Sequence, residues 1–345
     1  MGYIVIKPLY RTHELAFRTQ YAELKERTLS AGKLLPGTPG SLALRSGSGR
    51  SYWYRVFYTL PRKAWEEIVC KDGDHETLTA MRERMAFSGW AAAQVAALRK
   101  LEFQVADKTT ARVLVELYNR QVFEAGLVLV GTLGYMAWLN ELGAIAVTAR
   151  TLDIDVARRQ PLKLAAPLSF LETMKDTGLP FVAVPGLPST SPSTSVKLPG
   201  IDGLRVDVLA PGKVLGATIH VPELAWVAQA IPHYDYLLAD AERSVMLAGG
   251  HCIPVRLPQA ARLVWHKLYA STQRRGSPEK AAKDQQQALV LGAAIAENGS
   301  DDLHNAFLAA PKPMRTPIRP LLNQLANKAE AHPALVEILH QCLNG

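Results

Sequence analysis

The stretch AGLVLVGTLGYMAWLNELGAIAVTARTLDIDV, residues 125–156, decides the fold that we expect for this chain. Its first apolar segment, residues 127–130, predicts a buried strand. Gly131 and Thr132 then predict a tight turn, and residues 133–142 have the pattern of a helix. The stretch therefore begins as a strand, a glycine turn and a helix.

A second apolar strand ends this stretch and carries two aspartates. Asp153 and Asp155 lie two residues apart, so they face the same side of the strand. On the other side we expect Leu152, Ile154 and Val156 to face a core. Like charges held this close repel each other, and a divalent cation between them would remove that repulsion. The pattern therefore indicates a metal site.

A third carboxylate, Asp207, lies in LRVDVLAP, residues 204–211, which has the same strand pattern. If this strand pairs beside the strand of Asp153 and Asp155, the three carboxylates converge. Carboxylate oxygens are the ligands that Mg²⁺ and Mn²⁺ prefer, and three carboxylates suffice to hold a pair of such ions for in-line phosphoryl transfer.

The motifs Gly-Thr at a strand-to-helix turn, Asp-x-Asp on the next strand and a single Asp on a later strand resemble the nucleotidyltransferase fold of the DNA polymerase β superfamily. Within it, the chain is similar to the bacterial minimal nucleotidyltransferases, which include abortive-infection-type toxins. The resemblance implies that Gly131 and Thr132 hold a triphosphate. It also implies that Asp153, Asp155 and Asp207 bind the metals, and that Asp207 helps to activate the acceptor hydroxyl.

The chain departs from the commonest pattern of this family in two ways. Thr132 stands where Ser is more usual, which keeps a hydroxyl. The spacing from Gly131 to Asp153 is longer than in the most compact members, which indicates a longer helix or an inserted hairpin over residues 143–150. Neither change removes a ligand.

Two alternative interpretations of these residues remain open from the sequence. Asp153 and Asp155 would have a purely structural role if they were bonded to one of the nearby arginines, Arg150, Arg158 or Arg159. Thr132 would be an ordinary helix cap if its side chain bonded the first-turn amides, although phosphate binding uses the same amides.

A helical hairpin is predicted after the catalytic strands, with helices over residues 258–272 and 278–297. It resembles the hairpin of the toxin-like nucleotidyltransferases, in which Lys-Leu, a basic turn (here Arg274-Arg275-Gly276) and Lys-Asp recur. By that resemblance Lys267 contacts the nucleotide, and Lys283 and Asp284 brace it or the acceptor. The alternative for all three is a solvated helix face with an ordinary ion pair.

Lys197, which precedes the strand of Asp207, is a further candidate for phosphate binding, with an exposed strand residue as the alternative.

The N-terminal region combines a helix over residues 11–30 with a linker over 31–49 and aromatic strands over 41–70. Basic and aromatic residues mix in these strands, which suits stacking on bases and pairing with phosphates. The alternative is that the aromatic side chains fill the core of this small sheet and the arginines form its solvent-exposed face. The residues concerned are Arg45, Arg50, Tyr52, Trp53, Tyr54, Arg55, Tyr58, Arg62 and Lys63.

The composition bounds the class of protein. A formal net charge of +8 in 345 residues favours a polyanionic partner such as nucleic acid or nucleotide phosphate. The 3 cysteines are far apart and lack metal-ligand spacing, and the chain has no long apolar run and no signal-peptide pattern at its start. We therefore expect a cytoplasmic protein without a membrane partner. The P-loop motif GxxxxGK[ST] is absent from the sequence, which argues against a P-loop ATPase.

The expected architecture is α+β: a mixed sheet with flanking helices, a small N-terminal β-hairpin and helical region, and C-terminal helices. We predict domain boundaries at residues 1–74, 75–124, 125–257 and 258–345. Within the third unit we expect a helix at residues 222–229, and within the fourth a basic linker at 311–319.

The predicted activity is metal-dependent transfer of a nucleoside monophosphate from an NTP, such as ATP, to a hydroxyl. RNA is the expected acceptor, with a tRNA 3′ end as the most specific expectation and a protein hydroxyl or a small molecule such as an aminoglycoside as the alternatives. The resemblance adds a role as a toxin or defence component with an antitoxin partner. The alternative is an inactive nucleotidyltransferase fold that binds RNA or a protein partner.

Overall fold

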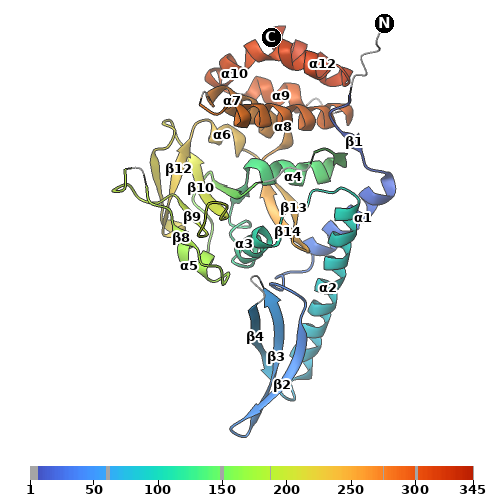
Figure 1. Cartoon of the computed structure of the whole chain (residues 1–345), viewed down its shortest axis with the longest axis vertical. Helices are drawn as coiled ribbons and strands as arrows, with labels where there is room; N and C mark the ends of the chain where they lie inside the picture. The colour runs from blue at the N-terminus through green and yellow to red at the C-terminus, as the bar shows by residue number, and fades with distance from the viewer. Residues whose placement is uncertain are drawn as a thin grey trace.

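The computed structural model describes residues 7–59, 63–147, 151–186, 188–274, 276–299 and 302–344. It confirms the α+β class, because a mixed sheet lies among helices and further helices follow it at the C-terminal end (Figure 1). Among the described residues, no helix is both long enough and apolar enough to cross a membrane.

The central sheet has the strand order β11-β12-β10-β7-β5, with β9 and β8 joined to β10. Strands β7, β10 and β12 are parallel to one another, while β5 runs antiparallel to β7 and β11 antiparallel to β12. The bounds are β5 (Leu127–Leu129), β7 (Asp153–Arg158), β8 (Val182–Ala183), β9 (Ser195–Lys197), β10 (Arg205–Pro211), β11 (Thr218–Val221) and β12 (Trp226–Ile231).

Helices and a separate β-hairpin surround this sheet. The helices are α3 (Lys108–Asn119), α4 (Gly131–Leu142), α5 (Phe170–Lys175) and α6 (Tyr234–Leu237), and the hairpin is β13 (Glu242–Ala248) with β14 (His251–Leu257). The C-terminal helices are α7 (Ala260–Gln273), α8 (Pro278–Glu297), α9 (Asp302–Ala309), α10 (Lys312–Ile318), α11 (Leu322–Lys328) and α12 (Pro333–Asn344).

One hydrophobic core joins the sheet to the C-terminal helices. It contains Val156 of β7 and Val208 of β10 together with Trp265 of α7, Leu291 of α8 and Phe307 of α9. All five side chains are buried. The C-terminal helices therefore pack against the sheet as part of the same core.

The N-terminal segment forms a projecting arm. Strands β2 (Ser41–Gly47), β3 (Arg50–Thr59) and β4 (Lys63–Lys71) make an antiparallel sheet, and α1 (Leu15–Leu29) and α2 (His75–Lys100) connect it to the body. Figure 1 shows this sheet at the end of the molecule opposite the C-terminal helices, with α2 beside it. The short strands β1 (Arg11–Thr12) and β6 (Ala144–Ile145) pair and tie the N-terminal segment to the end of α4.

Two contacts fix the arm. The Arg55 guanidinium is fully buried and donates hydrogen bonds to the carbonyls of Pro36 (2.8 Å), Thr38 (2.6 Å) and Pro39 (2.9 Å) in the linker. Arg55 therefore has a structural role and is not available to a phosphate. At the base of the arm, Trp65 of β4 packs against Gly178, which has a φ of +77°.

The structure corrects several element predictions. Residues 222–229 are not a helix: a single 3₁₀ turn, Pro222–Leu224, precedes β12, whose backbone pairs with both β10 and β11. Pairing within the sheet thus overrides the local preference. The basic segment 311–319 is mostly helix α10, because Pro313 lies in its first turn, where no amide donor is required.

The stretch between α4 and β7 also differs from expectation. Leu152 is 49% exposed because it precedes β7 and lies outside its pleat, whereas Ile154 and Val156 are buried as predicted. The expected longer helix or hairpin at 143–150 is not present in its described part, where β6 pairs with β1 instead. Residues 148–150, including Arg150, lie outside the described residues, as do Arg62 and Arg275.

Candidate active site

The parallel pairing of β7 and β10 brings the predicted carboxylates together. Asp155 lies directly opposite Asp207, and Asp153 lies opposite Arg205. Residues opposite each other in adjacent strands share a face of the sheet, so the carboxylates project from one side. The conditional prediction that these strands pair is confirmed, while the roles of the carboxylates stay predictions.

Gly131 marks the place where the start of α4 meets Asp155. A Cβ on Gly131 would lie 2.1 Å from Asp155 Oδ2, and the φ of this residue is +66°. Only glycine permits both the conformation and the contact. The backbone N–H of Val130 donates to the backbone carbonyl of Asp155 over 3.0 Å, which fixes the helix start to β7.

The first turn of α4 has amides available to a ligand. Its N-cap residue is Val130, which makes no side-chain cap hydrogen bond. Thr132 therefore lies within the first turn of α4 and not at its N-cap position, while the choice between a structural helix start and a phosphate site at Gly131 and Thr132 stays a prediction. Free amides and the positive end of the helix dipole suit an anionic group such as a phosphate.

Electrostatics distinguish the carboxylates. Burial, followed by the negative charges of Asp207 and Asp153, raises the pKa of Asp155 to about 7. Burial also raises the pKa of Asp207, against the opposing effect of Arg205, whose Nε donates to Asp207 Oδ1 over 2.8 Å. Burial makes ionisation of an aspartate unfavourable when no cation is near. A nearby cation would stabilise the ionised form of such a side chain.

The helical hairpin adds a buried cation beside this site. Lys267 Nζ donates to Gln287 Oε1 over 2.7 Å and lies 3.5 Å from Asp284 Oδ1. Arg274 Nε lies 2.6 Å from Asp284 Oδ2. Burial lowers the pKa of Lys267, and the negative charges of Asp284 and Asp155 oppose that effect. Lys267 and Arg274 therefore place positive charge near Asp155.

A cavity of about 640 Å³ joins these parts. The predicted residues that line it are Gly131, Thr132, Asp153, Asp155, Asp207, Lys267, Lys283 and Asp284. Lys197 is not among its lining residues; its Nζ donates to the carbonyl of Ile201 over 3.0 Å. The structure thus brings together the predicted residues with this exception.

Sequence reasoning missed several residues of the cavity wall. Arg205 had a local signal, because it lies two residues before Asp207 on the same strand face. Gln229, Tyr269, Gln273 and Lys280 had none, because they reach the cavity through the packing of β12, α7 and α8. His266 also lines it, and its buried Nε2 has no hydrogen-bond partner among the residues that the structure describes.

The residue types of the site fit a divalent cation, since carboxylate oxygens converge from β7 and β10. Arg158 does not compete for Asp153 or Asp155, because it pairs with Glu223 over 2.9 Å. The three aspartates nevertheless do not form a complete metal-binding site. Within the described ranges, no three His, Cys, Asp or Glu side chains are gathered to hold a metal, and Asp207 is bonded to Arg205.

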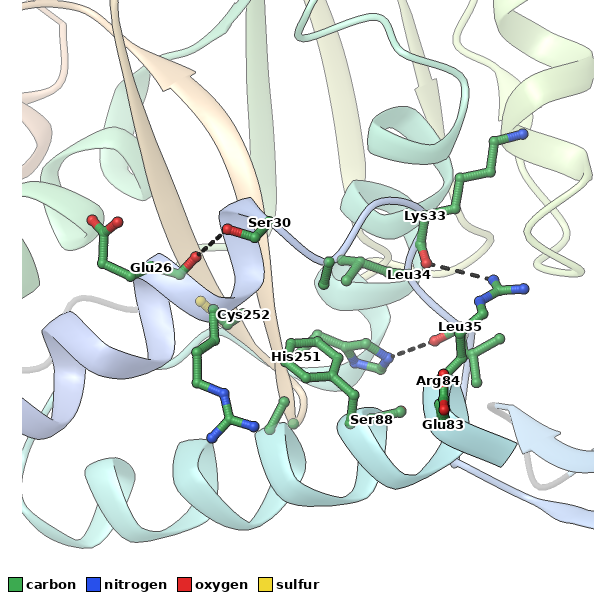
Figure 2. Close-up of a pocket in the computed structure, with 15 residues that line it drawn as sticks. Glu26, Ser30, Lys33, Leu34, Leu35, Glu83, Arg84, Ser88, His251 and Cys252 are labelled. Carbon is green, nitrogen blue, oxygen red and sulfur yellow. Dashed lines mark hydrogen bonds between the residues drawn. The ribbon is translucent and has the colours of Figure 1, made fainter. Parts of the chain in front are cut away.

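A second cavity, of about 530 Å³, lies between α1, α2 and the turn that precedes β14 (Figure 2). The His251 ring is bonded through Nε2 to the carbonyl of Leu35 over 3.1 Å, and Arg84 reaches the carbonyl of Lys33 over 3.5 Å. None of the predicted catalytic or nucleotide-binding residues lines it. These bonds hold the linker against the body.

A match to a known protein family covers the whole site. Residues 108–311 match a family described as nucleotidyltransferase, a range that includes every predicted site residue and begins after the arm. A solved structure of an antigenic nucleotidyltransferase-like protein from Paracoccidioides brasiliensis is similar over 67% of this chain and 91% of that chain, with 15% sequence identity and a TM-score of 0.34. No curated protein matches the chain.

Proposed function

The chain belongs to the nucleotidyltransferase family, and from this premise we propose that it transfers a nucleoside monophosphate from an NTP to a hydroxyl group. One observation carries the proposal: the register of β7 and β10 sets Asp155 beside Asp207, and Gly131 brings the start of α4 against Asp155. Carboxylates and free helix amides then face one cavity, where a triphosphate has both kinds of contact that it needs.

In the proposed reaction the acceptor oxygen forms a bond to the α-phosphorus of the NTP. The bond from that phosphorus to the oxygen bridging to the β-phosphate breaks, and pyrophosphate leaves. The hydroxyl proton passes to a base in the site or to water. A divalent cation held by Asp153, Asp155 and Asp207 would neutralise phosphate charge and lower the pKa of the acceptor hydroxyl.

The residues of the chain position the reactants. The first-turn amides of α4, at Gly131 and Thr132, bind phosphate oxygens, and Lys267 and Arg274 add positive charge on the opposite wall. In the proposal Asp207 orients the acceptor hydroxyl once its bond to Arg205 is released.

We propose RNA as the acceptor, with a tRNA 3′ end as the specific target, and a toxin or defence role with an antitoxin partner. The net charge of +8 supports an anionic polymer as substrate. The cavity wall supports it as well, since Arg274, Lys280 and Lys283 lie along one side.

The test uses each of the four NTPs labelled at the α-phosphate, with Mg²⁺ and total RNA. We expect label on RNA of tRNA length with the natural protein, and about a hundredfold less with Asp155→Asn, which keeps the shape of the side chain. Asp202→Asn is the matched control, because this exposed aspartate lies outside the cavity wall. RNA whose 3′ diol has been oxidised with periodate should accept no label.

Each other outcome rejects part of the proposal. Label on protein would support transfer and reject RNA as acceptor. Equal labelling by Asp155→Asn and the natural protein would reject the site.

One observation favours a second candidate, a binding module without activity: Asp207 is bonded to Arg205 rather than free for a ligand. This candidate predicts that RNA binds and that no labelled product forms with any NTP. Arg205→Gln separates the two, since release of Asp207 should keep or raise transfer in an enzyme and change nothing in a binding module.

A further inference from the structure

One face of the arm carries side chains that the described residues leave partly exposed. Along β3, alternate residues Tyr52, Tyr54, Val56 and Tyr58 share this outer face. The opposite, inner face carries Arg55 and Phe57, which are 0% and 5% exposed. Of the aromatic residues of β3, Phe57 therefore lies in the core of the arm, and three tyrosines lie on the outer face.

The outer face is partly open to solvent, with Tyr52 and Tyr54 half-buried. Tyr58 is 55% exposed, and Ile68, which lies opposite Tyr54 on β4, is 64% exposed. Among the described residues, the hydroxyls of Tyr52, Tyr54 and Tyr58 have no hydrogen-bond partner. Figure 1 shows the sheet projecting from the body with α2 along one side. An aromatic row in this position is available to a ligand.

The charge of this face is positive. Arg45 lies opposite Tyr52 on β2, Lys71 lies opposite it on β4, and Arg50 lies on the same face of β3. The acidic residue on this face, Glu66, pairs with Arg45 over 2.7 Å. Within the described chain, Arg50 and Lys71 have no carboxylate partner. A negatively charged partner is therefore favoured.

We propose that this face binds a single-stranded stretch of RNA, with bases stacked on Tyr52, Tyr54 and Tyr58 and phosphates near Arg50 and Lys71. Residues two apart on a strand are about 7 Å from each other, a spacing at which splayed bases stack on separate rings. That the nucleic acid is RNA rests on the proposed function, in which RNA is the acceptor.

The place of the arm explains why such a site would help. Trp65 packs on Gly178, which follows α5, so the arm is held at a fixed place on the catalytic unit. The arm lies away from the C-terminal helices that wall the active-site cavity (Figure 1). Only a long substrate reaches both, so the arm selects a polymer over a small hydroxyl compound.

The test measures binding of a fluorescein-labelled 12-nucleotide oligouridylate by anisotropy, in EDTA and without NTP. We expect the triple variant Tyr52→Ala/Tyr54→Ala/Tyr58→Ala to bind about tenfold or more weakly than the natural protein. The matched triple Tyr→Phe variant should bind as the natural protein does, because the rings remain. Equal loss in both triple variants, or loss in neither, would overturn stacking on these rings.

A second variant keeps the test valid if the alanine variant does not fold. Arg50→Glu/Lys71→Glu changes exposed side chains, and it should weaken binding and reduce the slope of log affinity against log salt by about 1.4. Lys312→Glu/Lys328→Glu makes the same charge change on exposed residues of α10 and α11 and should leave the slope unchanged. Equal slopes in both charge variants would reject the site.

Failure here is distinct from failure of the proposed function. A natural protein that labels RNA but does not bind oligouridylate overturns the arm site and leaves transfer intact. A protein that binds oligouridylate through the tyrosines but labels nothing supports the arm site and rejects transfer.

Discussion

Gly131 carries the tightest requirement of any single residue in the site, because its missing side chain makes room for Asp155. We predict that Gly131→Ala removes most nucleotidyl transfer and lowers the free energy of unfolding by about 1–3 kcal/mol, since the new Cβ collides with the carboxylate at a positive φ. Urea unfolding and the labelled-NTP assay measure the two effects.

Gly32→Ala is the control for the backbone part of this effect. Gly32 has a φ of +70°, and a Cβ added there would have no atom within 4 Å, so alanine meets the strain without the collision. Transfer by Gly131→Ala at the level of Gly32→Ala would contradict the role given to the contact with Asp155.

The residues of the site divide by how they could be found. Asp153, Asp155 and Asp207 were predictable because a strand places alternate residues on one face, and that rule is local. Tyr269 and Gln273 were not, since α7 reaches the cavity only through the packing of the C-terminal helices. Lys197 shows the converse: closeness in sequence to β10 did not bring its side chain to the cavity.

Among the elements, the contact between β4 and the loop after α5 determines how the arm is held. A Cβ on Gly178 would lie 2.6 Å from Trp65 Cζ2. We predict that Gly178→Ala lowers the free energy of unfolding by about 1–3 kcal/mol, partly through this collision and partly through its positive φ.

A double-mutant cycle isolates the collision. Trp65→Ala removes the ring, so Gly178→Ala should cost about 1 kcal/mol less in that background than in the natural protein, by urea unfolding. Additive effects of the two substitutions would show that Trp65 does not press on this glycine.

Helices and strands were predictable where the local sequence pattern was strong. They were not predictable where pairing with a distant segment determined the secondary structure. The strand-turn-helix-strand order from β5 to β7 follows from apolar periodicity and Gly131. Residues 226–231 form a strand because β10 and β11 offer backbone partners on both sides, which their own sequence does not reveal. Likewise, Arg55 is buried because the folded linker provides backbone carbonyls that accept its hydrogen bonds.

In the whole molecule, a single core spans the catalytic sheet and the C-terminal helices, while a smaller one joins α1 and α2 to the β13–β14 hairpin. The predicted domain boundaries stay predictions. The family match begins at residue 108, so the arm and both N-terminal helices lie outside the matched region. A binding site on the arm would therefore be a property of this chain rather than of the matched region.

Histidines whose pKa is lowered in the fold should reduce the stability of the protein in mild acid, whereas the raised pKa of Asp155 should act in the opposite direction. Burial lowers the pKa of His266 to about 4, and it also lowers the pKa of His13, His233 and His251. A group whose folded pKa is depressed stabilises the fold above its unfolded pKa, near 6.5 for histidine, and that stability is lost as the pH falls. Between pH 7 and pH 5, His266 alone should cost about 2 kcal/mol.

Urea unfolding of the natural protein and of His266→Gln across this pH range checks the prediction. Glutamine does not titrate, so on going from pH 7 to pH 5 the variant should lose about 2 kcal/mol less stability than the natural protein, which is the share of His266. The contributions of Asp155 and of the other three histidines should remain in both proteins. Glutamine also removes the imidazole from a site where Nε2 has no hydrogen-bond partner, so the comparison concerns the slope with pH and not the stability at any single pH. Parallel curves for the two proteins would mean that His266 is protonated in the folded state as readily as in the unfolded chain.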